Sequence, residues 1–218
     1  MAIGDPAIEV WIADASSPAW GVDGEGARAD ADRLSAVGRA LEAAVRHAGG
    51  PFGPCNLSHS GSQVVFAAAR SPSITHLGVD VEMRRDVPRP AAFARRILAE
   101  EEAGASDLVG AWTIKEAALK ATREGLAGEP TAWRFDDLGR SDPRLLNAPG
   151  AWGPPSNWAF LRTDIAGPAA LALAVRFDKI HSLDVWVRSV QGPADVSLAE
   201  RRSPLCLRWF PAGASAVS

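Results

Sequence analysis

The sequence predicts an α+β fold of two similar, pseudo-symmetric lobes, in each of which an antiparallel sheet packs on a long helix. Three observations support this fold class. Each half contains one long stretch of helical periodicity, several short strand-like stretches accompany each helix, and 47% of the 218 residues are hydrophobic, which is enough for a substantial core. We therefore divide the chain into lobes at residues 1–104 and 105–218, which together form one functional domain.

The first lobe begins with a strand and a long helix. Residues Glu9–Ala15 alternate as a strand does, and Ser16–Gly26 is rich in turn residues. Over Ala29–Ala48, apolar residues recur at three- and four-residue steps, which is typical of a helix, and Gly49-Gly50-Pro51 ends the pattern. The arginines expected on the solvated face of this helix are Arg33, Arg39 and Arg46.

A short polar segment precedes the next predicted strand, Gln63–Ala69. We place Ser58, His59 and Ser60 in a loop at the beginning of this strand. Hydroxyl, imidazole and exposed backbone amide groups in such a place can bind phosphate oxygens. The same residue types also satisfy the backbone of ordinary turns, so both interpretations stay open.

The following strand, Ile74–Glu82, introduces acidic residues and then a basic segment. Asp80 and Glu82 lie two residues apart, so both carboxylates should point to one side of the strand and Val81 to the other. Residues 83–96 contain one acid and five arginines, which suggests a surface for an acidic partner; an exposed arginine-rich helix explains the excess equally well. These arginines are Arg84, Arg85, Arg89, Arg95 and Arg96.

The second half is organised around another helix. Phe93–Ala103 looks helical, with the acidic run Glu100–Glu102 on its solvated surface, and the main helix runs from Asp107 to about Thr122. Gly139–Asn157 is an irregular loop, and the tail after Gln191 is polar and then briefly apolar. The expected strands are Ala132–Phe135, Trp158–Asp164, Ala169–Phe177 and Leu183–Val190.

Composition and charge exclude several classes of protein. The net charge of −3 argues against a general nucleic-acid binder. The N-terminus lacks the pattern of a secretory signal, and no segment approaches a membrane span, so we expect a soluble, cytoplasmic protein without membrane contact. Cys55 and Cys206 form neither a CxxC pair nor a zinc cluster with the four histidines, so both thiols should be reduced.

The candidate site combines three carboxylates with one lysine. Glu116 and Lys120 lie four residues apart on the main helix and therefore share one face. Only three of the 23 basic residues are lysines, and two of these, Lys115 and Lys120, fall within one helical turn. Because an ammonium differs chemically from a guanidinium, this choice suggests a specific role. An ordinary surface ion pair between Glu116 and Lys120, worth about 0.3–0.5 kcal/mol, is the alternative.

If Asp80, Glu82 and Glu116 converge, they form a hard oxygen site suited to Mg²⁺. A cation there would neutralise a pyrophosphate while Lys120 held another phosphate oxygen, so phosphoryl or phosphodiester chemistry is the natural class. A glycosidase pair would need neither the lysine nor a phosphate site. Walker A and Rossmann glycine patterns are absent, which argues against an ordinary kinase or dehydrogenase.

Three motifs in this order resemble the 4'-phosphopantetheinyl transferases of the Sfp type. They are NLSHSG at Asn56–Gly61, GVDVE at Gly78–Glu82 and WTIKEAALKA at Trp112–Ala121, followed by Gly125-Leu126. The ordered set is far more specific than any one motif, and the length is similar to that of the two-lobed monomeric type. The resemblance covers about Asn56–Leu126. It implies an active site between the lobes and transfer of 4'-phosphopantetheine from coenzyme A to a serine of an acyl or peptidyl carrier protein, with 3',5'-adenosine bisphosphate as the second product.

The resemblance also implies roles for individual residues. Asp80, Glu82 and Glu116 match the Mg²⁺ ligands, with Mn²⁺ as an alternative metal, and Glu116 is the candidate general base. Lys120, assigned a catalytic role beside Glu116, matches the lysine on the coenzyme A phosphates. Ser58 and His59 match the pair that binds these phosphates from the other lobe. Acidic carrier proteins would then be the partners of the arginines at residues 84–96.

One departure from the family pattern concerns the nucleotide. Relatives of this type usually carry a lysine just before a proline upstream of the serine-histidine motif, where this chain has Gly49-Gly50-Pro51. We assign Arg33 to coenzyme A binding among the few upstream basic residues. Two other functions fit less fully: a carrier-binding module that has lost turnover, and a Mg²⁺-dependent pyrophosphate hydrolase that acts without a carrier.

Overall fold

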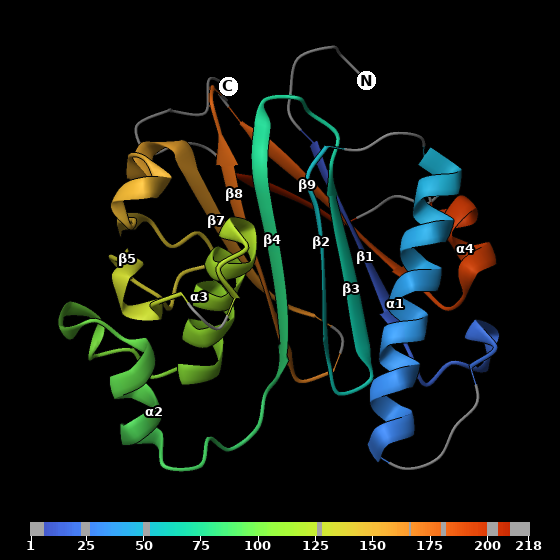
Figure 1. Ribbon diagram of the computed structural model, residues 1–218, viewed down its shortest axis with the longest axis horizontal. Coiled ribbons are helices and arrows are strands. Elements are labelled where there is room, and N and C mark those ends of the chain that lie inside the picture. Colours follow the sequence, from blue (N-terminus) through green and yellow to red (C-terminus); the bar gives the residue numbers. More distant parts are fainter. Residues whose placement is uncertain are drawn as a thin grey trace.

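The chain folds into a mixed α+β structure, as the sequence predicts. The computed structural model describes residues 7–22, 27–49, 53–125, 128–165, 167–179, 182–199 and 205–209, and within these ranges it contains three sheets and four α-helices. Figure 1 shows helices on both sides of two central sheets, with α1 and α4 on one side and α2 and α3 on the other. None of the described helices is both long enough and apolar enough to cross a membrane.

The larger sheet has five strands in the order β10-β9-β1-β3-β2. Strands β1 and β9 pair in parallel, and the other neighbours pair antiparallel. The parallel pair departs from the purely antiparallel sheets that the sequence led us to expect. The strands are β1 (Ala7–Asp14), β2 (Cys55–Ser60), β3 (Gln63–Ala69), β9 (Leu183–Val190) and β10 (Leu205–Trp209).

The second sheet is antiparallel and has the order β4-β8-β7. Its strands are β4 (Ile74–Met83), β7 (Trp158–Ile165) and β8 (Ala169–Phe177). A two-stranded ribbon, β5 (Arg134–Phe135) with β6 (Leu145–Asn147), lies in the segment between α3 and β7.

Among the described helices, α1 and α4 pack on the larger sheet, α3 packs on the smaller sheet, and α2 packs against α3. Helix α3 is buried along most of its length, as expected for a helix whose apolar residues extend around nearly the whole surface. Asp107 caps its N-terminus by accepting a hydrogen bond from the Gly110 N–H. The helices are α1 (Ala27–Gly49), α2 (Pro90–Ile97), α3 (Leu108–Thr122) and α4 (Pro193–Ala199).

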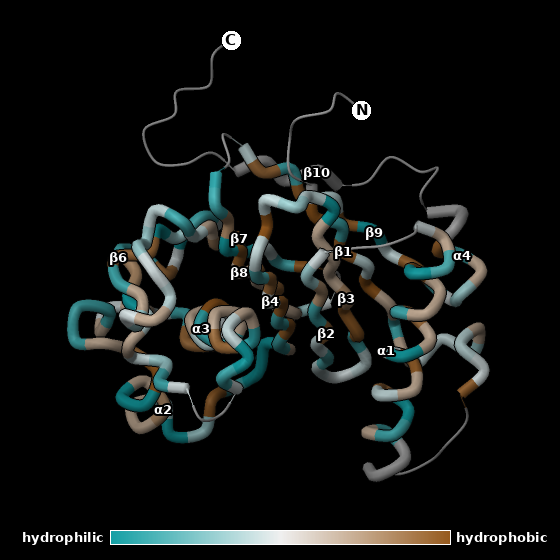
Figure 2. The backbone as a smooth tube through the Cα atoms, turned by 45° about the horizontal axis from the view of Figure 1, so that its top comes forward, coloured by the Kyte–Doolittle hydropathy of each residue, from teal (hydrophilic) through white to brown (hydrophobic). Residues whose placement is uncertain are grey.

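Side-chain alternation along the strands divides the interior into three layers of hydrophobic core. On β3, Val65 and Ala67 pack between the two sheets, whereas Val64 and Phe66 pack against α1. The third layer lies between α3 and the outer face of the smaller sheet, where it includes Phe160. In Figure 2 the hydrophobic stretches are concentrated in the central strands.

Strand pairing does not follow the two halves of the sequence. Strand β4, from the first half, pairs with β8 of the second, and β9, from the second half, pairs with β1 of the first. The division at residues 1–104 and 105–218 stays a prediction.

Most predicted elements are confirmed, and the differences have local causes. The predicted polar loop at Ser58–Ser60 is wrong, because these residues belong to β2 and the turn lies at Gly61, where φ is +60°. The predicted helix over Phe93–Ala103 ends as α2 at Ile97, and a 3-10 turn at Glu100–Glu102 follows. Helix α4 and the short strand β6 lie in segments that the sequence suggested were irregular or polar. Part of the Gly49-Gly50-Pro51 stop and Leu126 lie outside the described residues.

Candidate active site

The candidate site lies where β2, β4 and α3 meet. Strands β2 and β4 belong to different sheets, yet they run side by side, because polar side chains on alternate residues of β2 accept hydrogen bonds from alternate backbone N–H groups of β4. A period-two run of Asn, Ser and Ser is the signal in the sequence that could have revealed this junction. The three bonds run from Val79 N to Asn56 Oδ1 (3.3 Å), from Val81 N to Ser58 Oγ (3.3 Å) and from Met83 N to Ser60 Oγ (3.1 Å).

Gly78 sets the close approach of β4 to α3. A Cβ atom at this position would lie 2.5 Å from the backbone N of Ala121 and 3.0 Å from the backbone C of Ala117, and nearer still to the Ala117 carbonyl oxygen. Only glycine therefore allows the helix to pack at this distance. The close packing brings the next residues on the same face of the strand, Asp80 and Glu82, towards α3.

Lys120 bonds across to β4 and β2. Its Nζ lies 2.6 Å from Asp80 Oδ1 and 2.7 Å from Ser58 Oγ, and the Ser58 hydroxyl lies 2.8 Å from the same Asp80 oxygen. Asp80 and Ser58 are buried, whereas 25% of the Lys120 side chain is exposed. The ammonium therefore reaches solvent on one side and a buried carboxylate on the other. It forms no ion pair with Glu116, so the surface-pair alternative is wrong for Lys120.

Two carboxylate oxygens at this site are buried without a hydrogen-bond partner, namely Asp80 Oδ2 and Glu116 Oε2. Burial raises the pKa of Asp80 to about 6, although Lys120 and the Ser58 hydroxyl oppose the rise. Burial also raises the pKa of Glu116, and the charge of Glu82 adds to the rise while Lys120 offsets part of it. An unpaired buried acceptor is costly, so such oxygens point to a proton or a cation at the site.

Glu82 occupies the other end of the cluster and is held by two donors. Its Oε2 accepts a hydrogen bond from Ser60 Oγ (3.0 Å), and its Oε1 accepts one from the indole N–H of Trp112 (3.3 Å). Neither bond to Glu82 was predicted, because the sequence marks Ser60 only as a candidate phosphate-binding group and gives Trp112 no role. Trp112 precedes Glu116 by one helical turn, which places the two side chains on one face of α3.

The donor chemistry fits a hard divalent cation. The described residues contain no group of three or more His, Cys, Asp or Glu side chains that could already hold a metal ion. Asp80 and Glu116 nevertheless each offer an unpartnered carboxylate oxygen, which is the ligand type that Mg²⁺ prefers, and Glu82 lies close enough for its charge to raise the pKa of both.

The structure does not bring His59 and Arg33 to this cluster. Because side chains alternate on β2, His59 lies on the face opposite Ser58, where it is exposed. Arg33 donates to the Ser16 carbonyl oxygen (3.3 Å) on the α1 side of the larger sheet. Their predicted roles in binding coenzyme A stay predictions.

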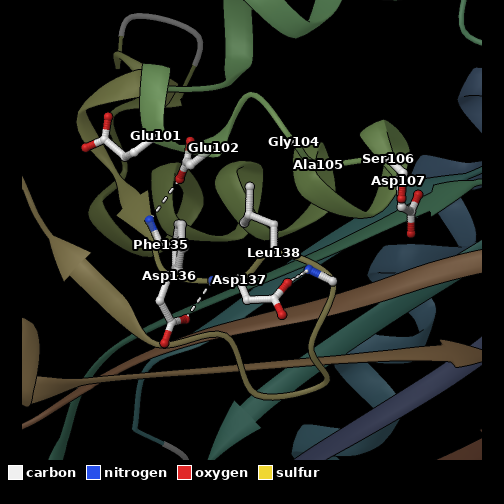
Figure 3. A pocket seen from close by; sticks show the side chains of 11 residues that line it. Glu101, Glu102, Gly104, Ala105, Ser106, Asp107, Phe135, Asp136, Asp137 and Leu138 are labelled. Carbon is white, nitrogen blue, oxygen red and sulfur yellow. Dashed lines mark hydrogen bonds between the residues drawn. The ribbon is translucent and has the colours of Figure 1, made fainter.

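The second lysine of the helix has a structural position. Lys115 is fully buried, and its Nζ lies 2.5 Å from Glu102 Oε2 and 2.6 Å from the Trp133 carbonyl oxygen. Burial lowers the pKa of Lys115, and the adjacent Glu102 opposes this shift. Glu102 also accepts the backbone N–H of Phe135, as Figure 3 shows. The expectation of a fully solvated Glu100–Glu102 run is therefore wrong for Glu102.

Two hollows lie near α3. One has a volume of about 330 Å³ and borders the candidate site, because Glu82 and Trp112 line it together with Arg85 and Phe93. The other, of about 220 Å³, is the pocket in Figure 3. It is lined by acids that bond to neighbouring groups, such as Asp137 with the Gly139 N–H, and none of Asp80, Glu116 and Lys120 lines it.

Most of the candidate site lies in a segment that is similar to a known protein family. Residues 76–174 match the family model of the 4'-phosphopantetheinyl transferase superfamily. The matched segment runs from β4 to β8 and contains three acids and the lysine of the cluster, although it covers less than half of the chain. Over this segment the chain is therefore similar to the 4'-phosphopantetheinyl transferase superfamily. A comparison with curated proteins finds no match.

Proposed function

We propose that this protein transfers the 4'-phosphopantetheine group of coenzyme A to a serine hydroxyl of an acyl or peptidyl carrier protein, as a two-lobed monomer of the Sfp type. One observation carries the proposal: Asp80, which has an unpartnered oxygen, bonds to the Lys120 ammonium and the Ser58 hydroxyl, and the charge of Lys120 also acts on Glu116, which has an unpartnered oxygen of its own. Carboxylates that could bind a metal and donors that could bind a phosphate are thus available where β2, β4 and α3 meet.

The residues divide into two binding roles. Asp80, Glu82 and Glu116 would hold Mg²⁺, or Mn²⁺ in its place, and the bound cation would neutralise the charge of the pyrophosphate. Lys120 and Ser58 would donate hydrogen bonds to phosphate oxygens, because their donor groups already converge on one point beside Asp80. Coenzyme A is then the co-substrate.

Glu116 would act as the general base. Burial raises the pKa of Glu116, which makes its carboxylate a stronger proton acceptor. In the transfer step, the carrier serine oxygen forms a bond to the β-phosphorus of coenzyme A while its proton passes to Glu116. The bond from that phosphorus to the bridging oxygen breaks, and 3',5'-adenosine bisphosphate leaves with the electron pair.

The carrier protein would dock beside Glu82. The hollow of about 330 Å³ is lined by this residue and by Arg85, and further exposed arginines follow Arg85 in the chain. Arg84 contributes less, because it already pairs with Asp107 and Asp164. The remaining exposed arginines that would face an acidic carrier are Arg85, Arg89, Arg95 and Arg96.

The test is incubation with coenzyme A, Mg²⁺ and a panel of apo-carrier proteins, followed by mass spectrometry of the carriers. We expect one carrier to gain a phosphopantetheine group. Glu116→Gln should lower the rate by about a hundredfold or more, because it removes the base and a metal ligand. Glu101→Gln is the matched control, since Glu101 is exposed and pairs with Arg134 away from the site. A folded wild-type protein that modifies no carrier contradicts the proposal.

A carrier-binding module without turnover is the second candidate. It is favoured by the position of Arg33, which bonds to Ser16 rather than to the cluster and leaves the nucleotide without its expected upstream support. This candidate predicts carrier binding that survives Glu116→Gln and no modified carrier in the wild type. Release of phosphopantetheine with the carrier omitted would instead indicate a pyrophosphate hydrolase.

A further inference from the structure

Three basic side chains gather at the end of the site face, beyond Gly78. His76 and Arg176 are direct cross-strand partners on β4 and β8. Arg123 follows α3 and lies close enough for its charge to act on His76. None of the three belongs to the cluster described above, and the sequence motifs include none of them.

The positive charge of this group is not balanced by acids. In the described part of the chain, neither Arg123 nor Arg176 forms an ion pair with a carboxylate, and the Nε of Arg176 is buried without a partner. Burial lowers the pKa of His76, and the charges of Arg176 and Arg123 lower it further. The two guanidinium groups beside His76 carry the positive charge without a carboxylate partner in the described residues, and this arrangement favours a ligand that supplies negative charge.

Neighbouring groups hold His76 in place and engage the nearby Glu124. The ring of Trp152 packs edge-on against His76 with centroids 5.5 Å apart, and the Trp152 indole N–H donates to Glu124 Oε1 (2.8 Å). Glu124 is therefore engaged by the indole. Within the described ranges, the guanidinium of Arg176 makes one long hydrogen bond, of 3.4 Å, to the hydroxyl of Thr75.

The basic group continues the line of the candidate site. Residues 76, 78, 80 and 82 of β4 share one face, so His76 lies about 13 Å along the strand from Asp80. Arg123 lies one helical turn after Lys120. A ligand with two separated phosphate groups could therefore contact Lys120 with one and the basic group with the other.

We propose that His76, Arg123 and Arg176 form a second anion subsite, which binds the 3'-phosphate of coenzyme A in place of the upstream lysine that this chain lacks. The inference rests on the proposed function, because that function supplies a ligand with both a pyrophosphate and a ribose 3'-phosphate. Two guanidinium groups can each form charge-assisted hydrogen bonds to such a phosphate.

The test is calorimetric binding of coenzyme A and of 3'-dephospho-coenzyme A, without turnover. We expect the wild type to bind coenzyme A at least tenfold more tightly. Arg123→Gly and Arg176→Gln should each weaken coenzyme A binding by about tenfold and leave dephospho-coenzyme A binding within twofold. Arg123 has a φ of +60°, which glycine adopts readily, so Arg123→Gly should fold well. Arg140→Gln is the charge-matched control, because Arg140 pairs with Asp142 in a loop.

The outcomes separate the two proposals. Equal affinity of the wild type for both ligands, or equal losses for both ligands in Arg123→Gly, overturns the subsite and leaves the proposed function intact. Absence of any coenzyme A binding by the folded wild type overturns both. A loss confined to the 3'-phosphorylated ligand, and absent from Arg140→Gln, supports the subsite.

Discussion

Replacing Gly78 with alanine should disrupt both the packing of α3 and the candidate site. The added Cβ would lie 2.5 Å from the Ala121 backbone N, and the obstacles are backbone atoms that cannot rotate away. Since carbon contacts are optimal at about 3.5–4.0 Å, the helix would have to move by about 1 Å or more. Overpacking of this kind usually costs about 1–3 kcal/mol, and we expect the upper end of that range.

The same movement would open the Lys120 bridge. Its bond to Asp80 is 2.6 Å, and an added 1 Å takes it beyond hydrogen-bonding distance. A displacement of about 1 Å in a catalytic group can lower a rate by about a hundredfold. Gly78→Ala should therefore lose transfer activity even under conditions in which it remains folded.

Urea unfolding followed by tryptophan fluorescence measures the stability, and the carrier mass assay measures the activity. Gly104→Ala is the matched control, because no atom lies within 4 Å of the Cβ that it would add, and its stability should change by less than about 0.5 kcal/mol. A Gly78→Ala protein with the unfolding midpoint and the transfer rate of the wild type would refute this account of the helix–strand contact.

Three further predictions concern charged side chains in and near the candidate site. Burial raises the pKa of Asp80 from 3.8 to about 6, so the folded state keeps a proton that the unfolded chain loses, and stability falls as pH rises from about 4 to 6. Without a divalent metal, Asp80→Asn should therefore stabilise the protein against urea by about 2 kcal/mol more at pH 7.5 than at pH 4.5. An equal gain at both pH values contradicts this. Lys120→Arg should lower the transfer rate at least tenfold in the mass assay, because a guanidinium does not fit the short contacts to Asp80 (2.6 Å) and Ser58 (2.7 Å). An unchanged rate would contradict a role of Lys120 in the reaction. Lys115→Met should lower the free energy of unfolding in urea by about 3–5 kcal/mol, because it leaves the Glu102 carboxylate unpaired. Adding Glu102→Gln to Lys115→Met should recover part of that loss. Additive losses in the double variant would argue against a coupled pair.

The local elements of the site could be predicted because short-range periodicity determines them. The four-residue step from Glu116 to Lys120 and the two-residue step from Asp80 to Glu82 define faces of a helix and a strand, and both faces are present in the structure. These spacings could not predict the hydrogen-bond and ion-pair partners of each side chain. Lys120 bonds to Asp80 rather than to Glu116, because Gly78 brings β4 within reach.

Strand pairing was less predictable for a different reason. The polar residues of β2 looked like a loop because no apolar face marks the segment as a strand. Their partners are backbone N–H groups of β4, about 23 residues further along the chain, and this pairing appears only once the two sheets are packed. The opposite orientation of His59 follows from the same assignment, since neighbouring residues of a strand lie on opposite faces.

Lys115 and Lys120 both stand out in the composition, but the structure gives each a different role. An arginine-rich chain that keeps two lysines in one helical turn indicates that an ammonium is needed at both, and the structure gives different reasons. Lys115 must be compact enough to fit a fully buried cage with Glu102 and a backbone carbonyl. Lys120 is partly exposed and reaches a buried aspartate whose second oxygen has no partner. Lys115 therefore finds its hydrogen-bond partners inside the protein. Lys120 leaves an unsatisfied acceptor beside a solvent-accessible cation, an arrangement that destabilises the isolated protein and gains from a bound metal and phosphate.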